Sequence, residues 1–246
     1  MNTRKKKKVA IWGIIIGLVL IIAAGSLYAY NWLFDYNADH QSQNLLDEIV
    51  LDFEWELPSM EDIINYIPSE AAPIVEISED QRVNSIEVYE DPFDDDDDNG
   101  SGNGGSGGYT GTWSAPSYSV IGIISIPRLD KRLPVLSDCS EYLLGISCCR
   151  VSGFADDKPS RLVIAGHNLY SQFKGLDVYE LGDIIAFTTI NGVTYYYEAV
   201  QIEAIHKTEG AKLLEATGWD LCLFTCKSNR VMRTVVYFAE VKATEN

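Results

Sequence analysis

LCLFTCKSNRVMRTVVYF, residues 221–238, contains two apolar runs joined by a short polar turn. The first run ends at Cys226, and Arg233 opens the second. This layout predicts two strands joined by a loop, with a thiol on one side of the loop and a guanidinium on the other. A strand cysteine is a small buried hydrophobic residue in most proteins, so this stretch alone leaves two interpretations of Cys226, a nucleophile or an inert core thiol.

The rest of the chain from Tyr118 onward has the same β-type character. Short apolar runs alternate with turn residues, and Asn191-Gly192 is a strong hairpin signal. Many short strands at close spacing over about 129 residues predict a mainly β fold, a compact barrel or sandwich with short helices, for residues 118–246. The other predicted elements are strands at 120–126, 132–136, 162–166, 184–188 and 193–200, and one short helix at 212–216.

The N-terminal part of the chain has the pattern of a membrane anchor. Residues 9–30 carry no charge over 22 positions, and a helix of that length spans about 33 Å, enough for a bilayer core of about 30 Å. Residues 1–8 hold five basic side chains and no acid, so the positive-inside rule predicts a cytoplasmic basic tail and an extracellular C-terminal domain. A cleaved signal peptide is the alternative, but its apolar core is shorter, about 7–15 residues.

Most of the net charge of −17 lies between the anchor and the β domain, where residues 35–98 hold 21 acids and one base. We interpret residues 31–89 as an acidic juxtamembrane segment. Within it, residues 44–65 are partly amphipathic and predict a stalk or a strap lying on the β domain, although a solvated acidic face is the favoured interpretation. The apolar side chains at helical spacing are Leu45, Leu46, Ile49, Val50 and Phe53.

Residues 90–117 have the composition of a disordered linker, with five consecutive aspartates followed by Gly, Ser and Asn. The aspartate run lacks the glycine and closing glutamate of an EF-hand loop, so it does not predict a calcium site. The domain at 118–246 is nearly neutral, with 15 acids and 13 bases. It therefore lacks the basic stripe that nucleic-acid binding requires.

The five cysteines do not form a metal-binding pattern. They lack a Cys-x-x-Cys pair, and the three histidines are far apart in the sequence, so we predict neither a metal site nor a cofactor. Cys222 and Cys226 would be about 13 Å apart along one strand, too far for a disulfide. A disulfide between Cys139 and the Cys148-Cys149 pair is left open, because the predicted compartment permits it.

Three residues have the chemistry of a cysteine enzyme. His167 follows a predicted strand that ends in the small residues Ala165-Gly166, Cys226 ends a second strand and Arg233 begins a third. A cysteine nucleophile needs a nearby proton acceptor or cation, because the thiolate is the attacking species. A guanidinium offers fixed donors for a developing oxyanion.

These residues and their neighbours closely resemble the sortases, membrane-anchored cysteine transpeptidases of Gram-positive bacteria. The resemblance is carried by LVIAGHN at 162–168, LFTC at 223–226 and Arg233, with IGIISIP at 121–127 similar to the family's first strand and LGD at 181–183 similar to its Gly-Asp motif. Cys222 departs from the pattern, since a threonine often stands there. We favour Arg233 over Arg230 as the family's arginine, because Arg230 lies in the turn.

The resemblance implies a closed eight-stranded β-barrel and a transpeptidase reaction. Cys226 would attack a Leu-Pro-x-Thr-Gly-like sorting signal of a secreted protein, and an amine of a cell-wall precursor or a pilin lysine would resolve the thioacyl-enzyme. His167 would act as general acid and base, and Arg233 would stabilise substrate and oxyanion.

Two other functions remain compatible with the residues. One is a cysteine hydrolase with the same site, in which water replaces the amine, and the other is a tethered β-domain that binds a partner without catalysis. We also hypothesise that part of residues 44–77 folds over the active-site groove as a lid.

Overall fold

The computed structural model describes residues 3–53, 55–66, 113–115, 118–155, 158–215, 217–228 and 230–241. The chain divides into two compact units, Met1–Asn37 and Ala38–Asn246. The first unit is the N-terminal part of helix α1, Thr3–Phe53. The second contains the remainder of α1 and all of the described strands.

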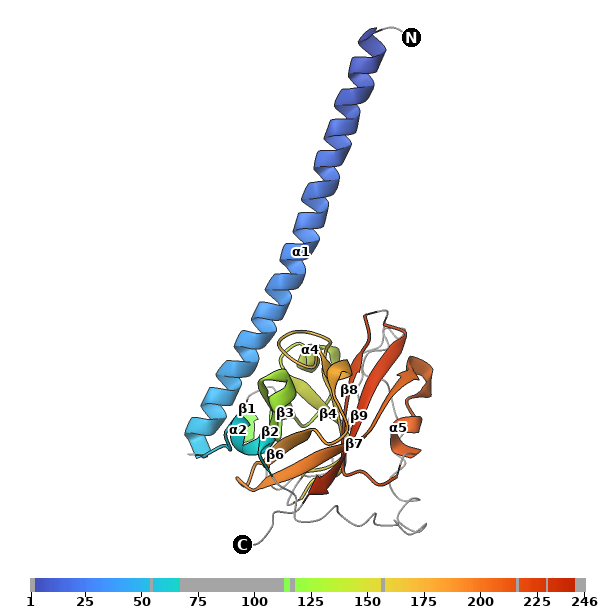
Figure 1. Ribbon diagram of the computed structural model, residues 1–246. Coiled ribbons are helices and arrows are strands. Elements are labelled where there is room, and N and C mark those ends of the chain that lie inside the picture. Colours follow the sequence, from blue (N-terminus) through green and yellow to red (C-terminus); the bar gives the residue numbers. More distant parts are fainter. Residues whose placement is uncertain are drawn as a thin grey trace. The chain divides into compact units, whose positions relative to one another are not determined.

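Eight strands of the second unit close into a barrel, which confirms the predicted fold (Figure 1). The strand order is β2-β3-β4-β5-β8-β9-β7-β6, and β6 pairs back onto β2. A short ninth strand, β1, extends the sheet beyond β2. The strands are β1 Trp113–Ala115, β2 Tyr118–Ile126, β3 Lys131–Leu136, β4 Cys148–Phe154, β5 Ser160–Ala165, β6 Ile184–Thr189, β7 Thr194–His206, β8 Leu221–Cys226 and β9 Met232–Val241.

Short helices and turns join these strands. The hairpin predicted at Asn191-Gly192 connects β6 to β7, and Gly192 has the positive φ of 78° that such a turn requires. Three residues of the predicted linker form β1, whereas residues 90–112 and 116–117 lie outside the described residues. The connecting elements are α2 Met60–Ile64, η1 Pro127–Leu129, α4 Glu141–Leu144, η2 Leu176–Val178, η3 Lys207–Glu209 and α5 Lys212–Glu215.

The barrel sheet is buried on both faces over much of its surface. In β8, Leu221 and Leu223 point into the barrel core, while Cys222 and Phe224 belong to a second apolar cluster on the outer face. A strand covered on both sides carries a continuous apolar run, which explains why residues 221–224 do not alternate with polar residues. The outer cluster also contains side chains of β2 to β5 and β9.

The part of α1 that lies in the second unit packs on this outer face. Leu45, Leu46 and Ile49 are at most 7% exposed and join the outer cluster. Asp47 and Glu48, on the other side of the helix, remain exposed. The predicted strap is therefore confirmed for this segment, and its acidic face is solvated as well.

Residues 55–66 continue along the barrel after α1 ends. The Trp55 ring lies against Gly192 at the β6–β7 hairpin, Arg132 of β3 donates to the Pro58 carbonyl, and Tyr66 stacks on Tyr196 of β7 with ring centroids 3.9 Å apart. Residues 67–77 lie outside the described residues. The lid hypothesis therefore stays a prediction.

Ile49 provides a direct test of this strap, since its side chain is fully buried. We expect Ile49→Ala to lower the free energy of unfolding by about 2–5 kcal/mol, because it leaves a cavity under the helix. Leu51→Ala is the matched control, since Leu51 lies on the same helix at 77% exposure and should change stability by less than about 0.5 kcal/mol. Denaturant unfolding in detergent measures both, and equal effects would contradict the packing of α1.

Part of α1 is long and apolar enough to cross a membrane. The predicted span 9–30 lies wholly within the helix. Apolar side chains such as Trp12, Leu20 and Leu27 are more than 60% exposed. Lipid can surround such side chains, and a helix satisfies its own backbone hydrogen bonds there.

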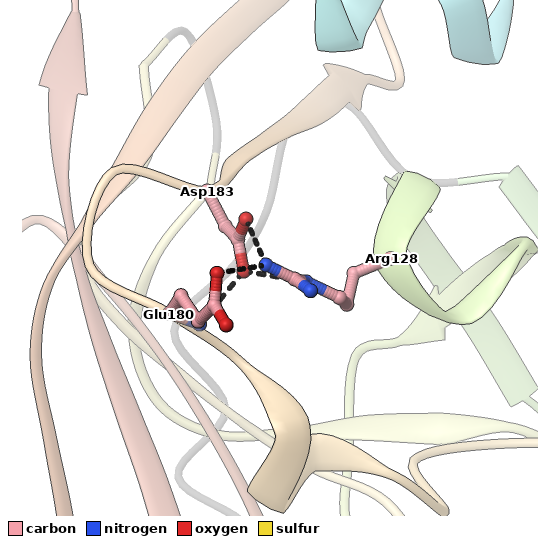
Figure 2. A network of polar contacts seen from close by, with 3 residues as sticks. All are labelled: Arg128, Glu180 and Asp183. Atoms are coloured by element: carbon pink, nitrogen blue, oxygen red, sulfur yellow. Dashed lines mark hydrogen bonds and ion pairs between the residues drawn. The ribbon is translucent and has the colours of Figure 1, made fainter.

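An ion-pair network joins the turn after β2 to the turn before β6 (Figure 2). The Arg128 guanidinium donates two hydrogen bonds of 2.7 Å to Asp183 and a third of 3.1 Å to Glu180. The hydrogen bonds to Asp183 have the largest effect in raising the pKa of Arg128, and the bond to Glu180 has the next largest. The contact joins Arg128, the residue after the 121–127 motif, to Asp183 of the 181–183 motif, 55 residues away in the sequence.

Candidate active site

Cys226 and Arg233 are direct neighbours across two antiparallel strands. Cys226 ends β8, Arg233 is the second residue of β9, and the two are paired in the register. Phe224 and Val235, two residues further into each strand, face the outer cluster. Residues two apart in a strand share a face, so Cys226 and Arg233 lie on the outer side of the barrel.

His167 reaches the same edge of the sheet from the other side of β8. Strand β5 runs parallel to β8, with Ala165 paired to Phe224, and the Gly166 amide donates to the Phe224 carbonyl at 3.2 Å. His167 follows immediately. The topology therefore places His167, Cys226 and Arg233 at the ends of three adjacent strands, in the order β5, β8, β9.

The two candidate arginines differ in their surroundings. Arg233 is only 1% exposed, and its guanidinium donates to the Arg230 carbonyl at 3.1 Å. Arg230 is exposed in the turn between β8 and β9, with a positive φ of 55°. Arg233 is thus held beside Cys226 within the sheet, whereas Arg230 borders the site from the turn. The role of each stays a prediction.

The surroundings of His167 favour its neutral form. Burial lowers the pKa of the imidazole, and the positive charge of Arg230 lowers it further. Both effects disfavour the imidazolium. The lowered pKa therefore keeps the imidazole of His167 mainly in its neutral form at neutral pH.

The loop that carries His167 is closely packed. A side-chain carbon added to Gly166 would lie 2.5 Å from the Phe173 ring, so a larger residue there would force the buried ring to shift. The His167 amide donates to the side chain of Gln172 at 2.7 Å, and the His167 carbonyl accepts from the Phe173 amide at 3.1 Å. Gln172 was not predicted from the sequence, where no motif or spacing marks it.

Residues 124–241 match the family model described as the sortase domain. The barrel belongs to the sortase family. The matched residues run from within β2 to the end of β9 and include all three candidate residues of the sortase site.

Solved structures similar to this sortase domain are also sortases. They include sortase C1 of GBS pilus island 1 (23% identity, 52% of this chain and 66% of that chain covered, TM-score 0.46). Sortase C-3 from Streptococcus pneumoniae is similar as well (28% identity, 52% of this chain and 65% of that chain covered, TM-score 0.46). So is sortase C-1 from Actinomyces oris (24% identity, 50% of this chain and 74% of that chain covered, TM-score 0.45). The chain thus spans just under two thirds of the first two structures. No significant match is found among curated protein sequences.

The other thiols of the sortase domain are less suited to act as nucleophiles. All five cysteines are free thiols in this structure, including Cys139, for which a disulfide was left open. Burial raises the pKa of Cys148 to about 12 and the pKa values of Cys149 and Cys222 well above their usual range. Cys226 and Cys139 are the two that are partly exposed. Cys226 alone combines this exposure with a place between a histidine and an arginine.

The effect of Arg230 on His167 can be measured directly. We expect Arg230→Gln to raise the pKa of His167, because it removes a positive charge that repels the imidazolium. Burial is the larger cause, so the value should stay below the usual range for histidine. An NMR titration of the His167 ring measures the change, with Lys158→Gln as control, since Lys158 pairs with Glu240 in the C-terminal half of β9. A His167 pKa that falls or stays constant in Arg230→Gln would contradict this electrostatic coupling.

Proposed function

We propose that this sortase is a membrane-anchored cysteine transpeptidase that cleaves a Leu-Pro-x-Thr-Gly-like sorting signal of secreted proteins. The observation that carries the proposal is the placement of His167, Cys226 and Arg233 at the ends of adjacent strands β5, β8 and β9. The sortase-domain match over residues 124–241 supports it. The acceptor would be an amine of a peptidoglycan precursor or a pilin lysine.

In the first half-reaction, neutral His167 takes the proton of the Cys226 thiol, and the thiolate attacks the scissile carbonyl. The guanidinium of Arg233 donates hydrogen bonds to the oxyanion that develops. The imidazolium of His167 then gives its proton to the departing amine, so that the carbon–nitrogen bond breaks and a thioester remains on Cys226.

In the second half-reaction, an acceptor amine attacks the thioester. His167 removes a proton from this amine, and Cys226 leaves as a thiolate that is reprotonated. A new amide joins the sorted protein to its acceptor. Water in place of the amine would give the hydrolase instead.

The N-terminal segments would place this reaction at the outer surface of the membrane. Residues 9–30 would anchor the chain, residues 1–8 would remain in the cytoplasm and the barrel would face the exterior. The five basic residues before the span support this orientation through the positive-inside rule.

The proposal is tested by mass spectrometry of the full chain after incubation with a panel of sorting-signal peptides. We expect an adduct on Cys226 with the mass of the N-terminal peptide fragment, which an added amine converts into an amide product. Conversion to a free acid alone, at the same rate with or without amine, would support the hydrolase. The proposal fails if Cys226 carries no adduct with any peptide and reacts with a thiol probe no faster than a model thiol.

A further inference from the structure

The loop after β5 closes into a compact turn around His167. The Gln172 amide donates to the Leu169 carbonyl at 3.0 Å, and the Phe173 amide donates to the His167 carbonyl at 3.1 Å. Residues 171–173 are at most 2% exposed. The buried segment 171–173 is therefore hydrogen-bonded to the backbone of the candidate histidine.

Gln172 uses both ends of its side-chain amide in this turn. Its Oε1 accepts from the His167 backbone amide at 2.7 Å, and its Nε2 donates to the Leu144 carbonyl at the end of α4, also at 2.7 Å. The side chain is 1% exposed. Only a group with an acceptor and a donor at this spacing satisfies both buried backbone groups, and leaving either unpaired is costly.

The Leu144 end of this connection belongs to a well-held part of the fold. Helix α4 is capped by Ser140, whose hydroxyl accepts from the Leu143 amide. The Ser147 hydroxyl, just after α4, donates to the Pro134 carbonyl at 2.7 Å and contacts the Ser42 hydroxyl of α1 at 3.2 Å. Ser147 and Ser42 are both fully buried. Gln172 therefore ties the backbone of His167 to a segment fixed on β3 and α1.

We infer that Gln172 is a positioning residue for the reaction of this site: it holds the backbone of His167 so that the imidazole keeps its place beside the end of β8. This inference rests on the proposed function for its catalytic consequence. The side chain of Gln172 bonds to two backbone groups, the His167 amide and the Leu144 carbonyl, and so acts through His167. The bond to the His167 amide acts on the segment that joins His167 to the sheet. The packing of Gly166 against Phe173 already makes that segment rigid.

The first test compares Gln172→Met with Ser147→Ala in the full chain. Methionine has a similar shape but removes both hydrogen bonds of Gln172. Ser147→Ala removes buried polar contacts next to α4 but keeps both Gln172 bonds, and the Ser140 cap and the backbone bonds of α4 still hold Leu144 in place. We expect Gln172→Met to lower kcat for peptide transfer by about 10- to 100-fold with KM changed less than about threefold. Ser147→Ala should keep kcat within about twofold of wild type even where it lowers stability.

The second test uses Gln172→Glu and a pH profile. A protonated glutamic acid offers one donor and one acceptor and so reproduces both bonds, and burial favours that neutral form. Ionisation removes the donor that faces the Leu144 carbonyl. We expect this variant to approach wild-type kcat at the acidic end of its range and to show a new loss of activity as pH rises, absent from the profiles of wild type and Gln172→Met.

The third test is independent of turnover. The chain has three histidines, so ring-labelled histidine gives three NMR signals, which His167→Gln assigns. We expect Gln172→Met to shift the His167 signal and its titration while the other two stay unchanged, and Ser147→Ala to leave all three in place. If wild type forms no acyl-enzyme, the proposed function fails while this measurement still decides the role of Gln172. An unmoved His167 signal in Gln172→Met, or a loss of kcat equal to that of Ser147→Ala, overturns the inference.

Discussion

A Cys226→Ala variant is expected to form no covalent adduct with any sorting-signal peptide and to lose transfer activity by roughly 10⁴-fold or more. In the proposed reaction the thioester forms on the thiol that ends β8, the strand that lies between the strands leading to His167 and carrying Arg233. Three of the other thiols, Cys148, Cys149 and Cys222, are fully buried, and Cys139 is partly exposed but lies between β3 and α4 rather than at the end of β8. Intact-mass spectrometry after incubation with peptide measures the adduct, and product formation in the presence of amine measures turnover.

Cys222→Ala is the matched control, because Cys222 lies in the same strand and on the same face but is completely buried. It should keep the adduct and most of the activity. An adduct that persists in Cys226→Ala, or one that disappears equally in Cys222→Ala, would refute the assignment of the nucleophile.

Arg233→Lys is expected to lower kcat/KM by about 10²- to 10³-fold, although the positive charge is kept. The guanidinium is 1% exposed and is oriented by its hydrogen bond to the Arg230 carbonyl. A lysine ammonium cannot reproduce this bond together with a planar pair of donors aimed at an oxyanion. Peptide-transfer kinetics at several substrate concentrations measure the loss.

Arg230→Lys separates the two arginines, since Arg230 is exposed in the turn. It should change kcat/KM by less than about threefold, because the lysine keeps a positive charge near His167. Alkylation of Cys226 by a small thiol reagent reports whether each variant retains the folded site. A larger loss for Arg230→Lys than for Arg233→Lys would assign the stabilising role to Arg230 instead.

Local patterns predicted much of the barrel because each strand of a small β fold has its own signals. The apolar runs that end at Gly166 and Cys226, and the hairpin at Asn191-Gly192, depend on neighbouring residues only. The length of α1 was harder to predict. Residues 31–53 continue the membrane-type helix without a break, and their helical conformation is stabilised by packing of Leu45 and Ile49 on a sheet that lies far away in the sequence.

The site was predicted as three separate residues, and its assembly depends on contacts that no local pattern contains. Strand β5 lies beside β8 through a parallel pairing across more than fifty residues, and only this pairing brings His167 to Cys226. Gln172 was missed for the same reason. Its partner Leu144 is 28 residues away, and a glutamine in a loop is ordinarily a solvated residue.

The burial of α1 against the barrel also determines where a soluble fragment of this protein can begin. Val120, Ile123 and Leu136 share the outer cluster with Leu45 and Ile49. A recombinant fragment starting at residue 118 would expose this apolar surface to water, which favours aggregation. A fragment that starts at residue 38 would omit the uncharged span and keep the helix that covers this face. The end of the predicted membrane span, rather than the start of the first barrel strand, is therefore the natural point for truncation.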